Sequence, residues 1–167
     1  MRLRPVEWLA VRYCLAFAAE PRPLTPAERR SAEEVFGAAL DVEPVRVVCA
    51  SIVNTPAALG NVIRIPPGFA LDSITLIHEL AHVWQYQTRG TEYISSSLWH
   101  QARSILSTGS RRGAYDVTWE DLTTPSIHEL PAEKQAVIIE RWFAYPHLRR
   151  HPDFERLLAE VRCGNSS

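Results

Sequence analysis

The segment from Asp72 to about Gln87 constrains the fold of this 167-residue chain more than any other feature. Its apolar residues point to all sides of a helix instead of forming one stripe: Ile74, Leu76, Ile77, Leu80, Ala81, Val83 and Trp84. A helix that is apolar nearly all round must be covered by other elements on several sides. The sequence therefore predicts a helix in the middle of the domain.

Start and stop signals predict the elements that surround this helix. Thr25, Pro26 and Glu28 form a capping-box start for a helix that is expected to run to about Leu40. The other expected elements are two β-branched strands at residues 45–49 and 61–65, a turn at 109–113, and helices at 95–107, 131–145 and 153–161. These elements predict a mostly helical α+β fold with a small sheet beside the central helix.

The length and the 46% hydrophobic content suit a single domain with one packed core. Residues 1–23 are expected to begin with an amphipathic helix packed on the domain, and residues 144–167 to contain the last helix. Glu7 and Arg12 interrupt the apolar part of the first segment, which therefore lacks the uncharged stretch of a signal peptide. No later segment has transmembrane length. We expect a cytoplasmic protein, although export by a machine that needs no cleaved signal would leave no trace in the sequence.

Charge and cysteine content exclude several classes of function. Eighteen Lys and Arg residues against 19 Asp and Glu residues give a net charge of −1, so the chain has no overall electrostatic attraction to nucleic acid or to an anionic membrane. Cys14, Cys49 and Cys163 lie far apart without a Cys-x-x-Cys pair, which indicates free thiols in a reducing compartment. None of them has a motif that would support a catalytic nucleophile.

The central helix contains the pattern His78-Glu79-Leu80-Ala81-His82, which is H-E-x-x-H. Histidines four residues apart lie about 40° apart around a helix and one turn along it, so both imidazoles can reach one ion at about 2.0–2.1 Å. Glu79 is rotated by about 100° from His78, which suits a general base better than a ligand. The alternative, a chance match with hydrogen-bonded core histidines, requires three ionisable groups to be buried at high cost. The motif therefore predicts a zinc site with His78 and His82 as ligands.

A catalytic zinc site needs a third protein ligand and one open position. The metzincin pattern is excluded, because Gln85 replaces its glycine and Thr88 replaces its last histidine. Glu133 lies at the start of a predicted helix, where stabilisation of the helix dipole is an equally good explanation for it. The third ligand is expected among the downstream candidates His100, His128, Glu129, Glu133, Glu140, His147 and His151.

Several segments, in order, resemble a family of small H-E-x-x-H domains from Vgr-related and Rhs-associated bacterial proteins, akin to a peptidase domain of extracellular contractile injection loci. The resemblance covers about residues 24–143. The matching segments are Leu24–Glu28, Val35–Gly37, Val45–Val47, Leu59–Ile63, His78–Tyr86 and Ala114–Asp116. It implies a gluzincin-like fold, peptidase chemistry with zinc, a peptide or protein substrate, and partners in a secretion apparatus such as type VI.

The resemblance also implies a third ligand. The family carries a Glu-x-Gln-Ala pattern, which this sequence presents at residues 133–136, so the implied ligand is Glu133. Gluzincins often place an aspartate four residues after this glutamate, but here the position is Val137. The carboxylate that would orient a ligand histidine must then come from elsewhere or be missing. Tyr115 and His100 are candidates for stabilising an oxyanion, although such side chains more often have core or surface roles.

Three functions share these residues. The first is hydrolysis of a peptide bond by zinc and Glu79 as general base. The second is a zinc-stabilised adaptor or cargo module without catalysis, which would not need Glu79 and would usually have four protein ligands. The third is hydrolysis of a non-peptide amide or of cell-wall material. Because Glu79 is present, the sequence favours a hydrolase.

Overall fold

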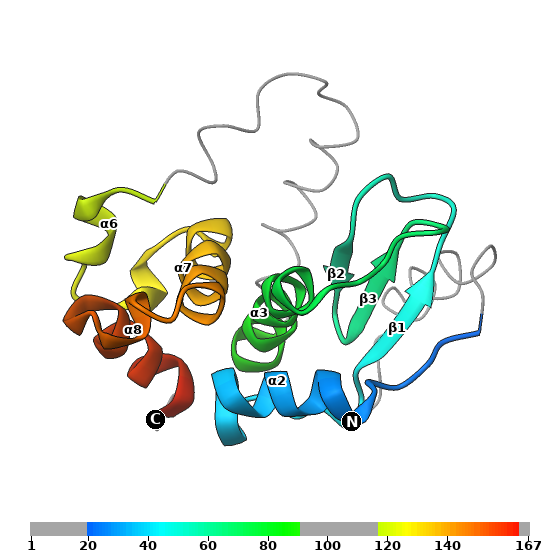
Figure 1. The fold of residues 1–167 in the computed structure, drawn as a ribbon, viewed down its shortest axis with the longest axis horizontal. Coiled ribbons are helices and arrows are strands. Elements are labelled where there is room, and N and C mark those ends of the chain that lie inside the picture. The colour runs from blue at the N-terminus through cyan, green and yellow to red at the C-terminus, as the bar shows by residue number, and fades with distance from the viewer. Residues whose placement is uncertain (1–19, 91–116, 164–167) are drawn as a thin grey trace.

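The computed structural model describes residues 20–90 and 117–163. These residues form an α+β fold, which confirms the predicted class. Helix α3 (Ser73–Arg89) lies in the middle, with a three-stranded sheet on one side and helix α7 (Ala132–Ala144) on the other. Figure 1 shows this order from right to left as sheet, α3 and α7. Apolar side chains from these elements form one core cluster.

Helix α3 confirms the prediction of a buried central helix. Asp72 is its N-cap and accepts hydrogen bonds from the backbone N–H groups of Ile74 and Thr75 at 2.9 Å. The helix ends at Gly90, whose φ of 66° favours glycine. Nine of the ten residues from Leu76 to Gln85 are buried, including Glu79, His82 and Gln85. The side chains of Glu79, His82 and Gln85 are therefore held on a packed helix with little freedom to move.

The sheet contains β1 (Arg46–Cys49), β2 (Ala57–Leu59) and β3 (Val62–Ile65) in the order β1-β3-β2. Strand β3 pairs parallel with β1 and antiparallel with β2. The sequence predicts β1 and β3 but not β2, because two of its three residues are alanines, which have low β-propensity. Gly60 turns the chain between β2 and β3 with a φ of 59°. This turn brings β2 alongside α3 at one edge of the sheet.

Helix α2 (Pro26–Phe36) has the predicted capping box. The Glu28 N–H donates to the side chain of Thr25, and the Thr25 N–H donates to the Glu28 carboxylate. The helix ends at Phe36 rather than near Leu40, because Gly37 adopts a φ of 55° and starts a short 3-10 turn. Helix α2 packs against α3 and holds Val35 and Phe36 in the core.

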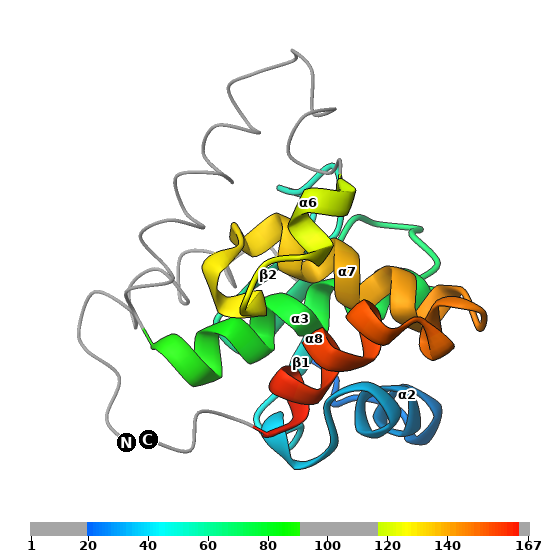
Figure 2. The ribbon, with the colours of Figure 1, turned by 90° about the vertical axis from the view of Figure 1, so that its left-hand side faces the viewer.

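The C-terminal elements hold α7 in place. Helix α8 (Pro152–Cys163) matches the predicted last helix and packs against α7 and α2, as Figure 2 shows. The carboxylate of Glu160 on α8 accepts from the Ser126 hydroxyl at 2.7 Å and from the Ile127 N–H at 3.0 Å. The short helix α6 (Trp119–Leu122), which is absent from the sequence prediction, is tied to α7 by the ion pair of Asp121 with Lys134. These contacts fix the segment that leads into α7.

Some predictions concern residues outside the described ranges. They are the helix in the first 19 residues, the helix at 95–107, the turn at 109–113 and the state of Cys14. Within the described ranges Cys49 and Cys163 are free thiols, as predicted. No described helix combines the length and the apolar character needed to cross a membrane.

Candidate metal centre

Two imidazoles lie next to each other on the face of α3 that meets α7. His78 and His82 occupy adjacent turns, and their ring centroids are 5.1 Å apart with planes inclined by 77°. Both side chains are mostly buried, with exposed fractions of 13% and 10%. The H-E-x-x-H spacing therefore produces the local geometry that the sequence predicts.

Glu133, in the first turn of α7, faces both imidazoles. Its Oε2 atom lies 3.5 Å from Nε2 of His78 and 3.6 Å from Nε2 of His82. Two ligands of a tetrahedral zinc ion, each about 2.0–2.2 Å from the metal, lie roughly 3.3–3.6 Å from each other. One ligand atom from each of these three residues lies within 4.8 Å of the others, so the group can hold a metal ion.

The state of the Glu133 carboxylate supports this fit. Its Oε2 atom is buried and makes no hydrogen bond of ordinary length, although the two imidazole Nε2 atoms lie 3.5 and 3.6 Å away. A buried carboxylate oxygen is costly unless positive charge beside it, from protonated imidazoles or from a metal ion, compensates it. The Glu133 side chain as a whole is 25% exposed, so part of it reaches solvent although Oε2 itself is buried. The three residues thus fit a zinc site with two histidines, one glutamate and an open position.

The electrostatics of the centre favour a positive charge. Burial lowers the pKa of His78, but Glu133 and Glu140 outweigh it and raise this pKa to about 10. Burial also lowers the pKa of His82, and Glu133 again raises it above the usual value. The desolvation that would raise the pKa of Glu133 is outweighed by the two histidines, which lower it. A divalent cation between these groups would satisfy the same demand for positive charge.

Glu140 supplies the carboxylate that the sequence left without an assignment. Its Oε2 atom lies 2.8 Å from Nδ1 of His78, on the opposite side of the ring from Nε2. Glu140 stands seven residues after Glu133, so both project from the same face of α7. Val137, the position at which gluzincins often have aspartate, is a buried core residue. Glu140 is therefore placed to orient His78. From the sequence it was predicted only as a candidate metal ligand.

Glu140→Ala is expected to weaken zinc binding by about 10–100-fold, because carboxylates that orient a ligand histidine typically contribute that much. Glu140→Gln keeps an acceptor for the Nδ1 proton and should lose less. Competition with a chromophoric chelator measures both. Glu155→Ala, on the far helix α8, serves as the control. An unchanged affinity in Glu140→Ala would contradict the orienting role.

His82 has a different partner. Its Nδ1 atom lies 2.9 Å from the Oε1 atom of Gln85, which is fully buried. Gln85 stands three residues after His82 and thus on the same side of α3. In the sequence, Gln85 is notable only because it replaces the glycine of the metzincin pattern. The spacing of three residues between His82 and Gln85 places the two side chains next to each other on a helix, so the sequence could have indicated this contact.

Glu79 is only 6% exposed. Its Oε2 atom is buried and has no hydrogen-bond partner, and the backbone of Ala58 on β2 provides a hydrogen bond to the carboxylate. Burial raises the pKa of Glu79, although His82 and His78 counteract it. A raised pKa brings a carboxylate closer to the range in which it can both accept and donate a proton.

The other candidate ligands do not join this cluster. His128 stacks on Trp84 with ring centroids 5.5 Å apart, and Glu129 is exposed. His147 is exposed beside Tyr145, and His151 lies between Trp119 and Phe154. Tyr115 and His100, the candidates for oxyanion stabilisation, lie outside the described residues.

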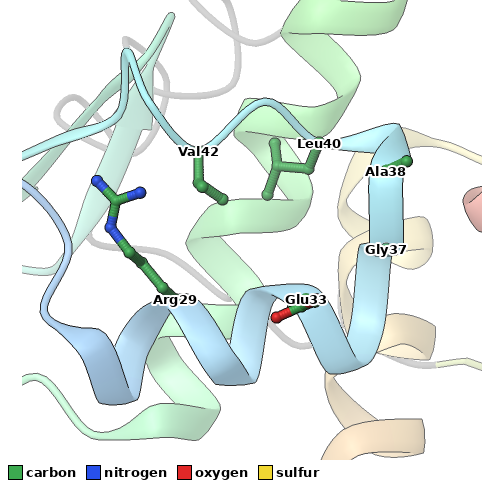
Figure 3. Close-up of a pocket in the computed structure, with 6 residues that line it drawn as sticks. All are labelled: Arg29, Glu33, Gly37, Ala38, Leu40 and Val42. Atoms are coloured by element: carbon green, nitrogen blue, oxygen red, sulfur yellow. The ribbon is translucent and has the colours of Figure 1, made fainter.

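The structure also has a hollow of about 430 Å³, which shares no lining residue with the metal centre. It lies along α2 and the turn that follows (Figure 3), and its lining residues are Arg29, Glu33, Gly37, Ala38, Leu40 and Val42. Arg29 is paired with Glu43, which satisfies its charge. None of the lining residues is a predicted site residue.

No family model matches the chain, and no curated protein matches it. Its structure is similar to a solved structure, the effector domain of Pseudomonas aeruginosa VgrG2b, with a TM-score of 0.61. The identity is 24%, and the match covers 92% of this chain and 92% of that chain. At this identity the similarity establishes a shared α+β fold and leaves the chemistry to be argued from the residues of the site.

Proposed function

We propose that this chain is a zinc-dependent hydrolase, and specifically a metallopeptidase. The observation that carries the proposal is the convergence of His78, His82 and Glu133, with Oε2 of Glu133 at 3.5 and 3.6 Å from the two Nε2 atoms. Two imidazoles and one carboxylate are the protein ligands of many catalytic zinc sites, whereas structural sites usually have four protein ligands. Three protein ligands leave a fourth position for water, which favours a catalytic site.

A zinc ion at this position would supply Lewis acidity, which activates a water molecule and polarises a carbonyl group. The three ligand residues hold their donor atoms in place before the ion arrives, because α3 and α7 are packed in the core. Glu140 and Gln85 make hydrogen bonds to the Nδ1 atoms of His78 and His82, which leaves both Nε2 atoms on the side where a zinc ion would bind.

Glu79 moves the proton in the proposed reaction. Its Oε2 atom accepts a proton from the attacking water while the new C–O bond forms, and donates it to the leaving amine nitrogen as the C–N bond breaks. Two observations support this role. The oxygen is buried without a hydrogen-bond partner, and burial raises the pKa of the carboxyl group.

The main alternative is an adaptor or cargo module in which zinc serves folding alone. Such a module has no use for an unpaired carboxylate oxygen buried beside the ligands, which costs stability. Glu79 therefore favours hydrolysis. Hydrolysis of a non-peptide amide would use the same residues, and the screen described below separates it from peptidase activity.

We further propose that the protein is an effector exported by a bacterial secretion system. The sequence resemblance to Vgr-related domains and the fold shared with the effector domain of VgrG2b support this setting. Proteins of such an apparatus are the expected partners, and a peptide or protein of the target cell is the expected substrate.

The first test is metal content. Elemental analysis of purified protein after zinc supplementation is expected to find about one zinc per chain, because the centre offers one set of three ligands. His78→Ala should lose most of this zinc. His147→Ala removes an exposed histidine outside the cluster and should keep it. Wild-type protein that retains no zinc would refute the metal centre.

The second test is activity. Zinc-loaded protein is screened against a peptide library, cell-wall fragments and simple amides, with a chelator control for each. Chelator-sensitive cleavage of peptides is the expected result. If only amides or cell-wall fragments are cleaved, the protein is a hydrolase of non-peptide substrates and the peptidase assignment is wrong. If no substrate is cut and zinc removal only unfolds the chain, both hydrolase assignments are wrong and the protein is a zinc-stabilised adaptor.

A further inference from the structure

Two glutamines, both fully buried, connect α3 to the beginning of α7. Gln85 lies on α3 and Gln135 on α7, and neither has exposed surface. The Nε2 atom of Gln85 donates to the backbone carbonyl of Ala132 at 2.9 Å and to Oε1 of Gln135 at 3.0 Å. The Nε2 atom of Gln135 donates to the carbonyl of Leu130 at 2.7 Å. With the contact from Gln85 to His82, these bonds form a chain from a backbone carbonyl to a ligand imidazole.

The carbonyl groups determine the direction of every bond in this chain. A backbone carbonyl can only accept, so the atom of Gln135 that faces Leu130 is its NH₂ group. The oxygen of Gln135 then faces Gln85, which must present its own NH₂ group there and to Ala132. The oxygen of Gln85 is therefore the atom that faces Nδ1 of His82. Since this oxygen can only accept, Nδ1 of His82 must carry the proton.

This direction has a consequence for the metal centre. When Nδ1 of a neutral imidazole carries the proton, Nε2 carries the lone pair. In His82 that is the atom 3.6 Å from Oε2 of Glu133. Gln85 also donates to the carbonyl of Ala132, the residue that directly precedes Glu133. One set of hydrogen bonds thus reaches a ligand on α3 and the backbone beside a ligand on α7.

We propose that Gln85 and Gln135 are positioning residues of the metal centre: they fix the metal-binding tautomer of His82 and hold it in register with Glu133. The inference rests on the proposed zinc site. A chain of two neutral amides orients His82 without adding a fourth carboxylate to a centre that already has Glu79, Glu133 and Glu140. A purely structural link between two helices is the competing explanation, and it predicts an effect on stability alone.

Gln85→Met and Gln135→Met test the proposal, because methionine keeps nearly the same length and volume and removes the hydrogen bonds. Gln87→Met is the matched control. Gln87 lies two residues further along α3, and its amide also makes three hydrogen bonds, to the backbone N–H and carbonyl of Asp41 and to Asn61. These bonds lead away from the metal centre, toward the sheet.

Zinc affinity is measured for all four proteins by competition with a chelator, and thermal unfolding is measured in excess chelator. Gln85→Met is expected to bind zinc about 10–100-fold more weakly than wild type. Gln135→Met, which does not touch His82, should weaken binding in the same direction by less. Gln87→Met should lower the unfolding temperature and leave the affinity unchanged.

A spectroscopic measurement separates positioning from stability. In the cobalt-substituted protein, the Nδ1 protons of ligand histidines give shifted NMR signals, and their exchange with solvent reports the hydrogen bonds they make. The His82 proton should exchange faster in both Gln85→Met and Gln135→Met. The His78 proton, which faces Glu140, should exchange as in wild type in all variants.

The outcomes distinguish this proposal from the proposed function. Wild-type zinc binding with unchanged affinity and unchanged His82 exchange in folded Gln85→Met and Gln135→Met would overturn the positioning role and leave the zinc site intact. Absence of zinc and cobalt binding in wild type would overturn both. Zinc binding without hydrolysis would overturn the hydrolase alone, since the positioning role does not depend on turnover.

Discussion

Glu79→Gln is expected to lower the rate of hydrolysis by about 10²–10⁴-fold, the usual contribution of a positioned general base. Glutamine has the shape of glutamate, so it can occupy the same buried position against β2 and disturb the neighbouring histidines little. Its amide cannot accept the proton of the attacking water as a carboxylate can. Steady-state kinetics on the best substrate of the screen measure the change.

The interpretation of this variant depends on its metal content. Glu79→Gln should bind zinc as wild type does, because Glu79 is not among the three ligand residues. Equal zinc occupancy must be shown by elemental analysis before the rates are compared. Glu34→Gln is the matched control, since it makes the same chemical change at a surface position on α2. A fully loaded Glu79→Gln protein with wild-type turnover would eliminate Glu79 as the base.

Glu133→Ala is expected to lower zinc affinity by more than roughly 100-fold. Partners that only orient a ligand are typically worth about 10–100-fold, and loss of a ligand itself should cost more. The substitution also removes the negative charge that both histidines face, so it removes attraction for the cation as well as a bond to it. Chelator competition gives the affinity, and circular dichroism shows whether the variant is folded.

Two further variants make this result specific. Glu129→Ala removes an exposed carboxylate just before α7 and should retain wild-type affinity. Glu133→Gln keeps an oxygen donor without the charge and should bind zinc with intermediate strength. If Glu133→Ala binds zinc as tightly as wild type does, another residue is the third ligand. The assignment of Glu133 would then have to be abandoned.

The central helix and its two histidines were determined by the sequence alone. The apolar pattern of residues 72–87 predicts a helix that other elements must cover, and helix geometry places His78 and His82 one turn apart on one face. The start of α2 was determined in the same way, because a capping box is made by residues three positions apart. In each case the interacting groups are close in sequence, so local geometry is sufficient.

Strand β2 was not determined locally. Alanines at two of three positions give β2 no strand signal, and it forms because it pairs with β3 and packs on α3. The end of α2 is instead a local effect: Gly37 adopts a positive φ that ends the helix, although Ala38, Ala39 and Leu40 after it are good helix formers. At β2, tertiary packing overrides a weak local preference.

The roles of Glu133 and Glu140 show most clearly what only the tertiary structure decided. The two residues are seven positions apart and lie on the same face of α7, so the sequence offers both as candidate ligands. Helix α7 runs antiparallel to α3 in a register that places Glu133 between the two Nε2 atoms and Glu140 at Nδ1 of His78. A shift of α7 by two turns, about 11 Å, would place Glu140 where Glu133 now lies. That register depends on the core side chains and on the Gln85–Gln135 contact between the helices, and no local sequence pattern encodes it.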